Sequence, residues 1–172
     1  AVIVPILADF HPDSVNSLVD HSESLVLFTD TDIWKKLDIT KMPSVKAVVS
    51  TADFKLLYAA DDKIQEVNDN LETLFAEKYP NGFSAADVNY PTDNDKELAI
   101  INYTSGTTSA PKGVMLRYEC ISENVAFGQK RLPSYPEDKI VSMLPMAHMY
   151  GMMFELIYPI CGGSSVYYLG KT

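Results

Sequence analysis

The chain has 172 residues, 47% of them hydrophobic, and a formal net charge of −9 at pH 7. This length and composition predict an ordered globular protein of about one domain rather than a disordered chain. The negative charge and the scattered lysines and arginines argue against nucleic acid or an anionic membrane as the main partner.

Neither the cysteines nor the apolar segments indicate export or membrane insertion. Cys120 and Cys161 lie in apolar segments without metal-ligand spacing, which predicts buried thiols in a reducing compartment and hence a cytoplasmic protein. No charged leader precedes a hydrophobic stretch, and the longest apolar run, near residues 149–163, is too short to span a bilayer. We expect no transmembrane segment; peripheral membrane contact and the oligomeric state stay open.

The first part of the chain predicts a short series of strands and helices. After the apolar run of residues 2–7, Pro12 opens a helix. The apolar face of this helix consists of Val15, Leu18 and Val19. Buried strands are predicted at residues 25–28 and 45–49.

A second helix is predicted in the middle of the chain, capped by Asp62 and ended by the Pro80-Asn81-Gly82 sequence. Its apolar face consists of Ile64, Val67, Leu71, Leu74 and Phe75. Residues 84–96 are polar and predict a loop that leads into a buried strand at residues 98–101.

The remaining residues continue this alternation. A weaker helix is predicted at residues 118–130, a strand at 140–144 and a final strand at 166–169. The helix between these strands has a methionine-rich stripe of Met149, Met152, Met153, Leu156, Ile157 and Ile160. Alternating strands and helices predict an α/β fold, with a mostly parallel sheet and helices on both faces.

Residues 102–114, N-Y-T-S-G-T-T-S-A-P-K-G-V, have the composition of a phosphate-binding turn. Glycine lets the backbone approach an anion, and hydroxyl groups, amides and a lysine donate hydrogen bonds to it. The G-x-x-x-x-G-K-[ST] pattern of nucleoside triphosphatases is excluded because Pro111 stands in place of its second glycine. The G-x-G-x-x-G fingerprint fails because residue 108 is threonine.

Residues 103–114 closely resemble the signature loop of the acyl-adenylate-forming enzymes, which include acyl-CoA synthetases, luciferases and the adenylation domains of peptide synthetases. Residues 143–151, M-L-P-M-A-H-M-Y-G, resemble the downstream L-P-x-x-H-x-x-G element of that family. Residues 4–7 and 21–24 look like its N-terminal region, and the fatty acyl-CoA synthetases are the most similar group. The resemblance implies that residues 1–172 form part of the AMP-binding N-terminal domain, without the C-terminal lid domain.

The resemblance implies ATP-dependent activation of a carboxylic acid, with a long-chain fatty acid as the favoured substrate. The acid becomes an acyl-adenylate and then acyl-CoA, so ATP, Mg²⁺ and coenzyme A are the expected cofactors and co-substrates. Negative charge builds up on the departing pyrophosphate, which makes positioning and electrostatic stabilisation the main requirements of the site.

The resemblance also implies roles for the loop residues. The expected nucleotide-binding residues are Thr104, Ser105, Gly106, Thr107, Thr108, Ser109, Lys112 and Gly113. Thr104 is in addition the candidate Mg²⁺ ligand, and Lys112 the candidate catalytic charge. The family usually has glycine in place of Ser109; this serine either restricts the backbone or adds a hydroxyl group, and both remain open.

His148 has two interpretations. Its place beside a methionine-rich helix favours a partly buried structural residue. Its place after Pro145, at a predicted helix start, favours a neutral ring near amides that suit an anion. In the resembled family the matching histidine lies by the substrate carboxylate, which makes His148 a candidate catalytic and substrate residue. Met149 and Gly151 are the candidate acyl-pocket residues, whereas core packing explains most of the stripe.

Three functions remain. The first is an N-terminal fragment of a fatty acid–CoA ligase, expected to be inactive alone because the chain has no Y-G-x-T-E element, ribose-binding acidic residue or lid lysine. The second is an aryl- or amino-acid-adenylating domain. The third is a nonenzymatic nucleotide-binding module.

Overall fold

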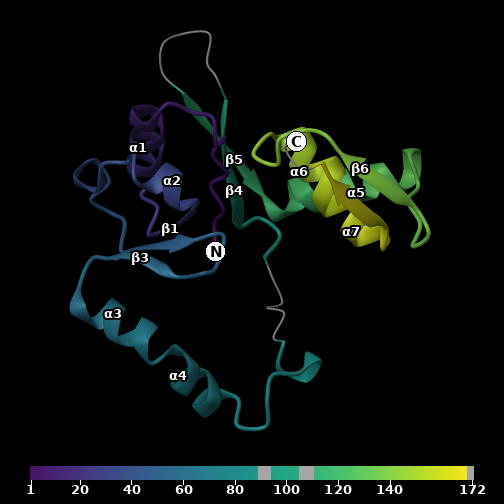
Figure 1. Cartoon of the computed structure of the whole chain (residues 1–172). Coiled ribbons are helices and arrows are strands. Elements are labelled where there is room, and N and C mark those ends of the chain that lie inside the picture. Colours follow the sequence, from purple (N-terminus) through teal and green to yellow (C-terminus); the bar gives the residue numbers. More distant parts are fainter. Residues whose placement is uncertain (89–93, 105–110, 170–172) are drawn as a thin grey trace. The chain divides into compact units, whose positions relative to one another are not determined.

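The computed structural model describes residues 1–88, 94–104 and 111–169 (Figure 1). The chain divides into two compact units: unit 1 is Ala1–Phe10 with Asp93–Thr172, and unit 2 is His11–Thr92. The first boundary lies between Phe10 and His11, and the second falls in the segment predicted as a loop, residues 84–96, which also contains a short 3-10 helix, η2 (Ala85–Asp87).

Unit 2 contains a three-stranded sheet of β1 (Val26–Thr29), β2 (Ala47–Ser50) and β3 (Leu56–Ala59). β1 pairs parallel and β3 antiparallel with the central β2. Val48 and Ser50 of β2 are 0% and 1% exposed, which is the alternation of a strand with one covered face. The two predicted strands are confirmed to within two residues. The sequence did not predict β3 or the short helix α2 (Thr31–Trp34).

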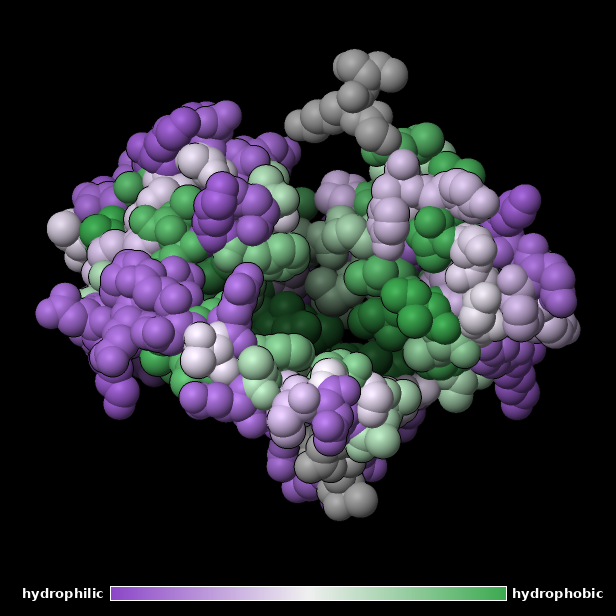
Figure 2. Space-filling view, turned by 60° about the horizontal axis from the view of Figure 1, so that its bottom comes forward, coloured by the Kyte–Doolittle hydropathy of each residue, from purple (hydrophilic) through white to green (hydrophobic). Residues whose placement is uncertain are grey.

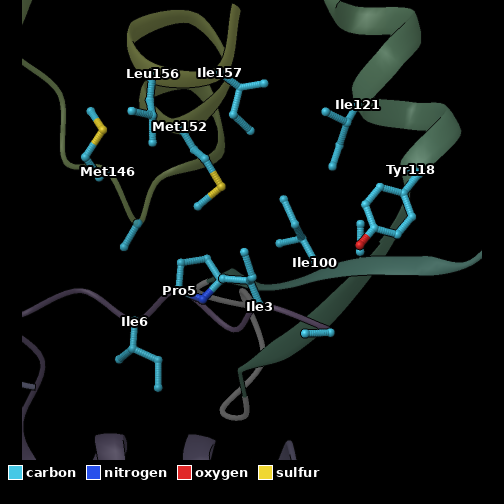
Figure 3. Close-up of a pocket in the computed structure, with 13 residues that line it drawn as sticks. Ile3, Pro5, Ile6, Ile100, Tyr118, Ile121, Met146, Met152, Leu156 and Ile157 are labelled. Atoms are coloured by element: carbon cyan, nitrogen blue, oxygen red, sulfur yellow. The ribbon is translucent and has the colours of Figure 1, made fainter. Parts of the chain in front are cut away.

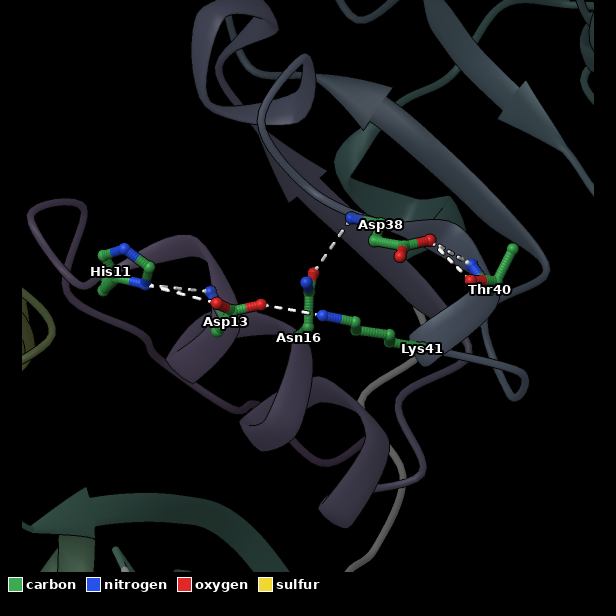
Figure 4. Close-up of polar contacts among 6 residues, drawn as sticks. All are labelled: His11, Asp13, Asn16, Asp38, Thr40 and Lys41. Atoms are coloured by element: carbon green, nitrogen blue, oxygen red, sulfur yellow. Dashed lines mark hydrogen bonds and ion pairs between the residues drawn. The ribbon is translucent and has the colours of Figure 1, made fainter.

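The first helix, α1 (Pro12–His21), begins at the proline as predicted. Its predicted face is buried, with Val15, Leu18 and Val19 at 6%, 2% and 1% exposure. Its first turn is also tied to the 3-10 helix η1 (Ile39–Lys41), because Lys41 Nζ donates to Asp13 Oδ1 at 2.8 Å (Figure 4). Both side chains of this ion pair are exposed, so apolar burial contributes more than the pair does.

The single helix predicted from Asp62 consists of two helices, α3 (Asp62–Asp69) and α4 (Leu71–Lys78). Asn70 separates them, and its side-chain amide donates to the Glu66 carbonyl at 2.8 Å, a local bond that competes with helix continuation. The N-cap is Asp61 rather than the predicted Asp62. The Asp61 carboxylate accepts from the Ile64 N–H at 3.0 Å.

Most of the predicted apolar face of α3 and α4 is exposed, and only Ile64 of the predicted residues is half-buried. The exposed residues are Val67, Leu71, Leu74 and Phe75, with exposures of 46%, 59%, 42% and 50%. The apolar period therefore identified the helices correctly, but these side chains do not join a core in the described part of unit 2.

Unit 1 is built around a hairpin of β4 (Leu98–Thr104) and β5 (Lys112–Arg117), which pair antiparallel. Ile3, from the N-terminal run, bridges in parallel to Ile100 on the other side of β4. Helix α5 (Tyr118–Arg131) follows β5 directly and matches the weaker predicted helix. A second sheet in this unit pairs β6 (Lys139–Ser142) in parallel with β7 (Ser165–Tyr168).

The methionine-rich helix of unit 1 is helical as predicted but changes its winding. It runs from α6 (Met149–Met152) through a π-helical turn, η3 (Met153–Ile157), into α7 (Tyr158–Gly162). The Tyr158 N–H donates to the Met153 carbonyl, one residue beyond an α-helical bond. Pro159 explains the wider turn, because a proline has no N–H to donate to the carbonyl of Glu155.

The α/β class is confirmed, but a mostly parallel sheet with helices on both faces is not. The described strands form three small sheets, in which two strand pairings are parallel and two antiparallel. The antiparallel pairings that the prediction missed are those of β3 and β5, which follow their partner strands through short connections. Such connections allow only antiparallel pairing.

Two predictions about side chains and spans can be compared with the structure. Cys161 is exposed and Cys120 half-buried, so the prediction of two buried thiols is wrong. In the described part of the chain, no helix is long and apolar enough to cross a membrane.

Apolar side chains reach the surface at Val141, Ile160 and Leu169 among others, and Figure 2 shows such hydrophobic residues (green) beside hydrophilic ones (purple).

Candidate functional site

The signature segment is the connection of the β4–β5 hairpin. Thr104 ends β4 and Lys112 begins β5, and the two residues are partners across the ladder. Both are exposed, at the end of the hairpin where the connecting segment begins (Figure 1). The other predicted loop residues, Ser105, Gly106, Thr107, Thr108 and Ser109, lie outside the described residues, so their contact with phosphate stays a prediction.

Gly113 has a packing role in the same hairpin. It pairs with Tyr103, and a Cβ atom on it would lie 3.0 Å from Cγ2 of Ile101 and 3.2 Å from Cε1 of Tyr103. The glycine therefore leaves room for the tyrosine ring across the ladder. Burial raises the pKa of Tyr103, so its phenol stays neutral at physiological pH.

Residues 143–148 form an irregular turn between β6 and α6, called here the His148 turn. His148 is the N-cap of α6: its Nδ1 accepts from the Tyr150 N–H at 3.3 Å, and its carbonyl accepts from the Met152 N–H at 3.0 Å. With Nδ1 as acceptor, the neutral ring carries its proton on Nε2. The side chain is exposed, which disagrees with the interpretation of a partly buried structural histidine.

A buried amide connects the hairpin to this turn. Asn102 lies in β4, is 6% exposed, and donates from Nδ2 to the Ala147 carbonyl at 3.0 Å. The residue directly before His148 is thereby fixed to the strand that leads into the signature segment. In the sequence Asn102 directly precedes the signature residues 103–114, but nothing there indicates this partner, which is 45 positions away.

A buried carboxylate holds the opposite end of the turn. Glu155, 9% exposed, accepts on one oxygen, Oε2, from Ser142 Oγ and from the N–H groups of Met143 and Leu144, each at 2.9 Å. The bond from the Leu144 amide is the main cause that lowers the pKa of Glu155, so the group is charged at neutral pH. Sequence reasoning missed this residue. The available signal was an acidic side chain within an apolar helix, which is costly to bury without partners.

Gly151 and Met149 pack against the turn and the core. A Cβ atom on Gly151 would lie 2.6 Å from the Pro145 carbonyl oxygen, so glycine permits the close approach of α6 to the turn. Met149 packs against a core cluster of Ala99, Ile100 and Met152. Neither Met149 nor Gly151 lines the cavity of unit 1, and their predicted contact with substrate stays a prediction.

Unit 1 contains an apolar cavity of about 630 Å³. Figure 3 shows side chains from the N-terminal run, β4, α5, the His148 turn and the methionine-rich helix pointing into it. Its lining includes Ile3, Ile100, Ile121, Met146, Met152 and Leu156. Because Met146 and Ala147 also line it, the cavity reaches the turn that bears His148.

The described residues offer no cluster of three or more His, Cys, Asp or Glu side chains that could hold a metal ion. The one predicted metal ligand among them is Thr104, a single hydroxyl group. It lies at the end of β4, beside the backbone of Lys112.

A family model described as AMP-binding enzyme matches residues 1–172. The chain is 26% identical to naringenin synthase of Pestalotiopsis fici over 172 residues, which is 97% of this chain and 6% of that protein. It is 28% identical over 173 residues to long chain acyl-CoA synthetase 6, peroxisomal, of Arabidopsis thaliana, covering 99% of this chain and 24% of the relative.

Among solved structures, the fold is similar to the anthranilate CoA ligase AuaEII in complex with anthranoyl-AMP. The TM-score is 0.77 at 17% sequence identity, over 99% of this chain and 31% of that one. At this identity the similarity shows a shared fold alone. Of the two curated relatives, naringenin synthase and the Arabidopsis acyl-CoA synthetase, the chain spans about a quarter of the length or less.

Proposed function

The chain belongs to the AMP-binding enzyme family, and from this we propose that the full-length gene product is an AMP-forming ligase that activates a long-chain fatty acid. The acid is joined to the adenylate of ATP and then transferred to coenzyme A. One observation carries the proposal: the His148 turn is bonded through Asn102 to the signature hairpin and also borders the apolar cavity. Groups suited to phosphate, carboxylate and alkyl chain thus occur around one strand, β4.

The polar residues at the hairpin end fit a polyphosphate. Lys112 supplies a cation and Thr104 a hydroxyl group, both exposed at the two ends of the signature segment. In the proposed site the Thr104 hydroxyl group would also be a ligand of Mg²⁺, which would supply positive charge to the polyphosphate. ATP supplies the α-phosphorus that the carboxylate oxygen attacks and the pyrophosphate that leaves. The Lys112 charge then stabilises the negative charge on the departing group.

The His148 turn and the cavity would hold the acid. His148 donates from Nε2 to a carboxylate oxygen and so orients the nucleophile. The cavity volume of about 630 Å³ lies within the range of small-molecule sites, and its apolar lining favours an alkyl chain over a charged side chain. The Arabidopsis relative, named as a long chain acyl-CoA synthetase, supports the same substrate class.

A second candidate is activation of an aryl acid. Anthranilate is the acid named for the solved structure with the shared fold, although that similarity shows the fold alone. We place it second because the cavity lining offers almost no polar side chain to bind a ring substituent.

Pyrophosphate release by the full-length gene product, with ATP, Mg²⁺ and a panel of palmitate, octanoate, anthranilate and phenylalanine, tests the proposal. We expect the highest kcat/KM for palmitate. A preference for anthranilate of about tenfold or more would replace the first candidate by the second. No release with any acid, together with retained ATP binding, would support a nonenzymatic module. The chain of residues 1–172 alone is the matched control and is expected to be inactive.

The cellular location remains part of the proposal. A cytoplasmic protein is expected from the sequence, whereas the Arabidopsis relative is named as peroxisomal. Fractionation of cells that express the full-length gene product distinguishes the two compartments.

A further inference from the structure

Two buried polar side chains that take no part in the proposed chemistry hold the two ends of the His148 turn. We propose that Glu155 and Asn102 are positioning residues, which fix this turn and thereby align His148 with the carboxylate of the acyl substrate. The inference rests on the proposed function, because it assigns to His148 the carboxylate contact described above.

The turn depends on these side chains because it has no regular secondary structure of its own. Residues 143–148 belong to neither β6 nor α6, so their backbone N–H and C=O groups have no regular ladder or helix partners and bond elsewhere. Within the turn, the His148 N–H donates to the Pro145 carbonyl at 2.9 Å. This bond closes the second half of the turn, and the remaining bonds that hold the turn come from the side chains of Glu155 and Asn102.

Glu155 fixes the first end. One carboxylate oxygen receives three donors, two of which are the N–H groups of Met143 and Leu144 at 2.9 Å. Bonds from amides to an ionised carboxylate are stronger than neutral ones. Because Glu155 belongs to the helix that begins at His148, the same bonds also fix that helix against the turn.

Asn102 fixes the second end. Its Nδ2 donates to the Ala147 carbonyl at 3.0 Å, one residue before His148, while its backbone lies in β4, two residues before Thr104. The side chain is 6% exposed, so its loss would leave a part-buried carbonyl without this donor. This bond therefore fixes the position of His148 relative to β4, the strand that leads into the proposed nucleotide-binding segment.

A double-mutant cycle on the full-length gene product tests whether Glu155 acts through His148. Glu155→Gln keeps the shape and one acceptor oxygen but removes the charge. We expect it to lower kcat/KM for the fatty acid about tenfold or more and to leave the KM for ATP unchanged, since the hydrogen bonds of Glu155 go to Ser142, Met143 and Leu144. After His148→Ala, the same Glu155→Gln change should cost less than about twofold.

The cycle separates positioning from general stability. A merely structural Glu155 would lower activity by the same factor with and without His148, and that additive result would overturn the inference. Glu123→Gln is the matched control, an exposed glutamate on α5 in the same unit, and should leave kinetics and melting temperature unchanged.

Asn102→Ala provides a second variant if Glu155→Gln does not fold. It changes no charge and removes one hydrogen bond to the turn, and we expect the same non-additivity with His148→Ala. An additive cycle for this variant too would overturn the assignment of Asn102.

Failure of the inference and failure of the proposed function give different results. Unchanged fatty acid kinetics in His148→Ala would overturn the inference, because His148 would have no contact to align, and would leave fatty acid activation standing. No pyrophosphate release by the unsubstituted full-length gene product with any fatty acid would overturn the proposed function. Impaired kinetics with an additive cycle would retain the function and overturn the positioning roles.

Discussion

The signature hairpin end and the His148 turn, which together carry the proposed chemistry, are held in opposite ways. The hairpin end is held by a backbone ladder and presents Thr104 and Lys112 as exposed side chains. The turn has no ladder and is held by buried side chains, Asn102 and Glu155. Substitutions at the hairpin end should therefore change the reaction rate and leave the stability of the fold unchanged. Substitutions around the turn should change both the rate and the stability.

The largest expected effect is at Lys112. Lys112→Ala in the full-length gene product should slow adenylation about 100- to 1,000-fold, because a preorganised donor at a developing negative charge is lost. Single-turnover pyrophosphate release measures the rate, and a thermal melt should be unchanged because the side chain is exposed. Lys130→Ala, at an exposed lysine of α5, is the control. A normal rate in Lys112→Ala would remove the hairpin end from the chemistry.

Gly151→Ala is the corresponding test of the turn. The added Cβ would meet the Pro145 carbonyl oxygen at 2.6 Å, so the helix start or the turn must move. Overpacking of this kind costs about 1–3 kcal/mol in the free energy of unfolding. Urea unfolding measures it, with Ala126→Gly on exposed α5 as a backbone control expected to cost about 1 kcal/mol or less. Unchanged stability and kinetics would show that the turn is not closely packed.

Thr104 sharpens the comparison within the hairpin end. Thr104→Ala should raise the Mg²⁺ concentration for half-maximal adenylation about tenfold, since loss of an oxygen ligand or its support typically weakens a metal site by 10–100-fold. Thr104→Ser keeps the hydroxyl group and should behave like the unsubstituted protein. Equal Mg²⁺ dependence in both variants would exclude Thr104 as a ligand.

The smallest expected effect is the pH dependence of stability that comes from the titration of Glu155. Because its folded-state pKa lies below the ordinary value of 4.5, the charged group contributes stability that is fully present above pH 4.5. This contribution is lost as the pH falls through the folded-state pKa. Melting temperatures of the unsubstituted protein and Glu155→Gln should thus differ at neutral pH and converge in acid. A difference that stays constant at every acidic pH at which the protein is folded would contradict the bonding of the charged form.

The two apolar stripes of the chain show what sequence patterns could and could not predict. The stripes on α3–α4 and on the methionine-rich helix both predicted helices, and both segments are helical. Leu71 in the first is 59% exposed, whereas Met152 in the second is 8% exposed and belongs to a core cluster. A period of 3.6 residues identifies the face of a helix, but what covers that face depends on segments distant in the sequence.

The site divides in a similar way. Thr104, Lys112 and His148 could be named as candidates from the order of residues in two short motifs, because the chemistry proposed for them is local to each motif. Glu155 could not, since its role comes from Ser142, Met143 and Leu144, which only the packing of β6 against the π-helical turn brings to its carboxylate.

The sequence by itself determined the family resemblance, the positions of most helices and strands, and the candidate reactive groups. These depend on residue order and on local periodicity. Only the tertiary structure decided that the signature segment connects an antiparallel hairpin, that the sheets are small and mixed, and that Asn102 and Glu155 hold the His148 turn. The physical reason is that strand pairing and buried hydrogen bonds join residues far apart in the chain, whose partners no local pattern specifies.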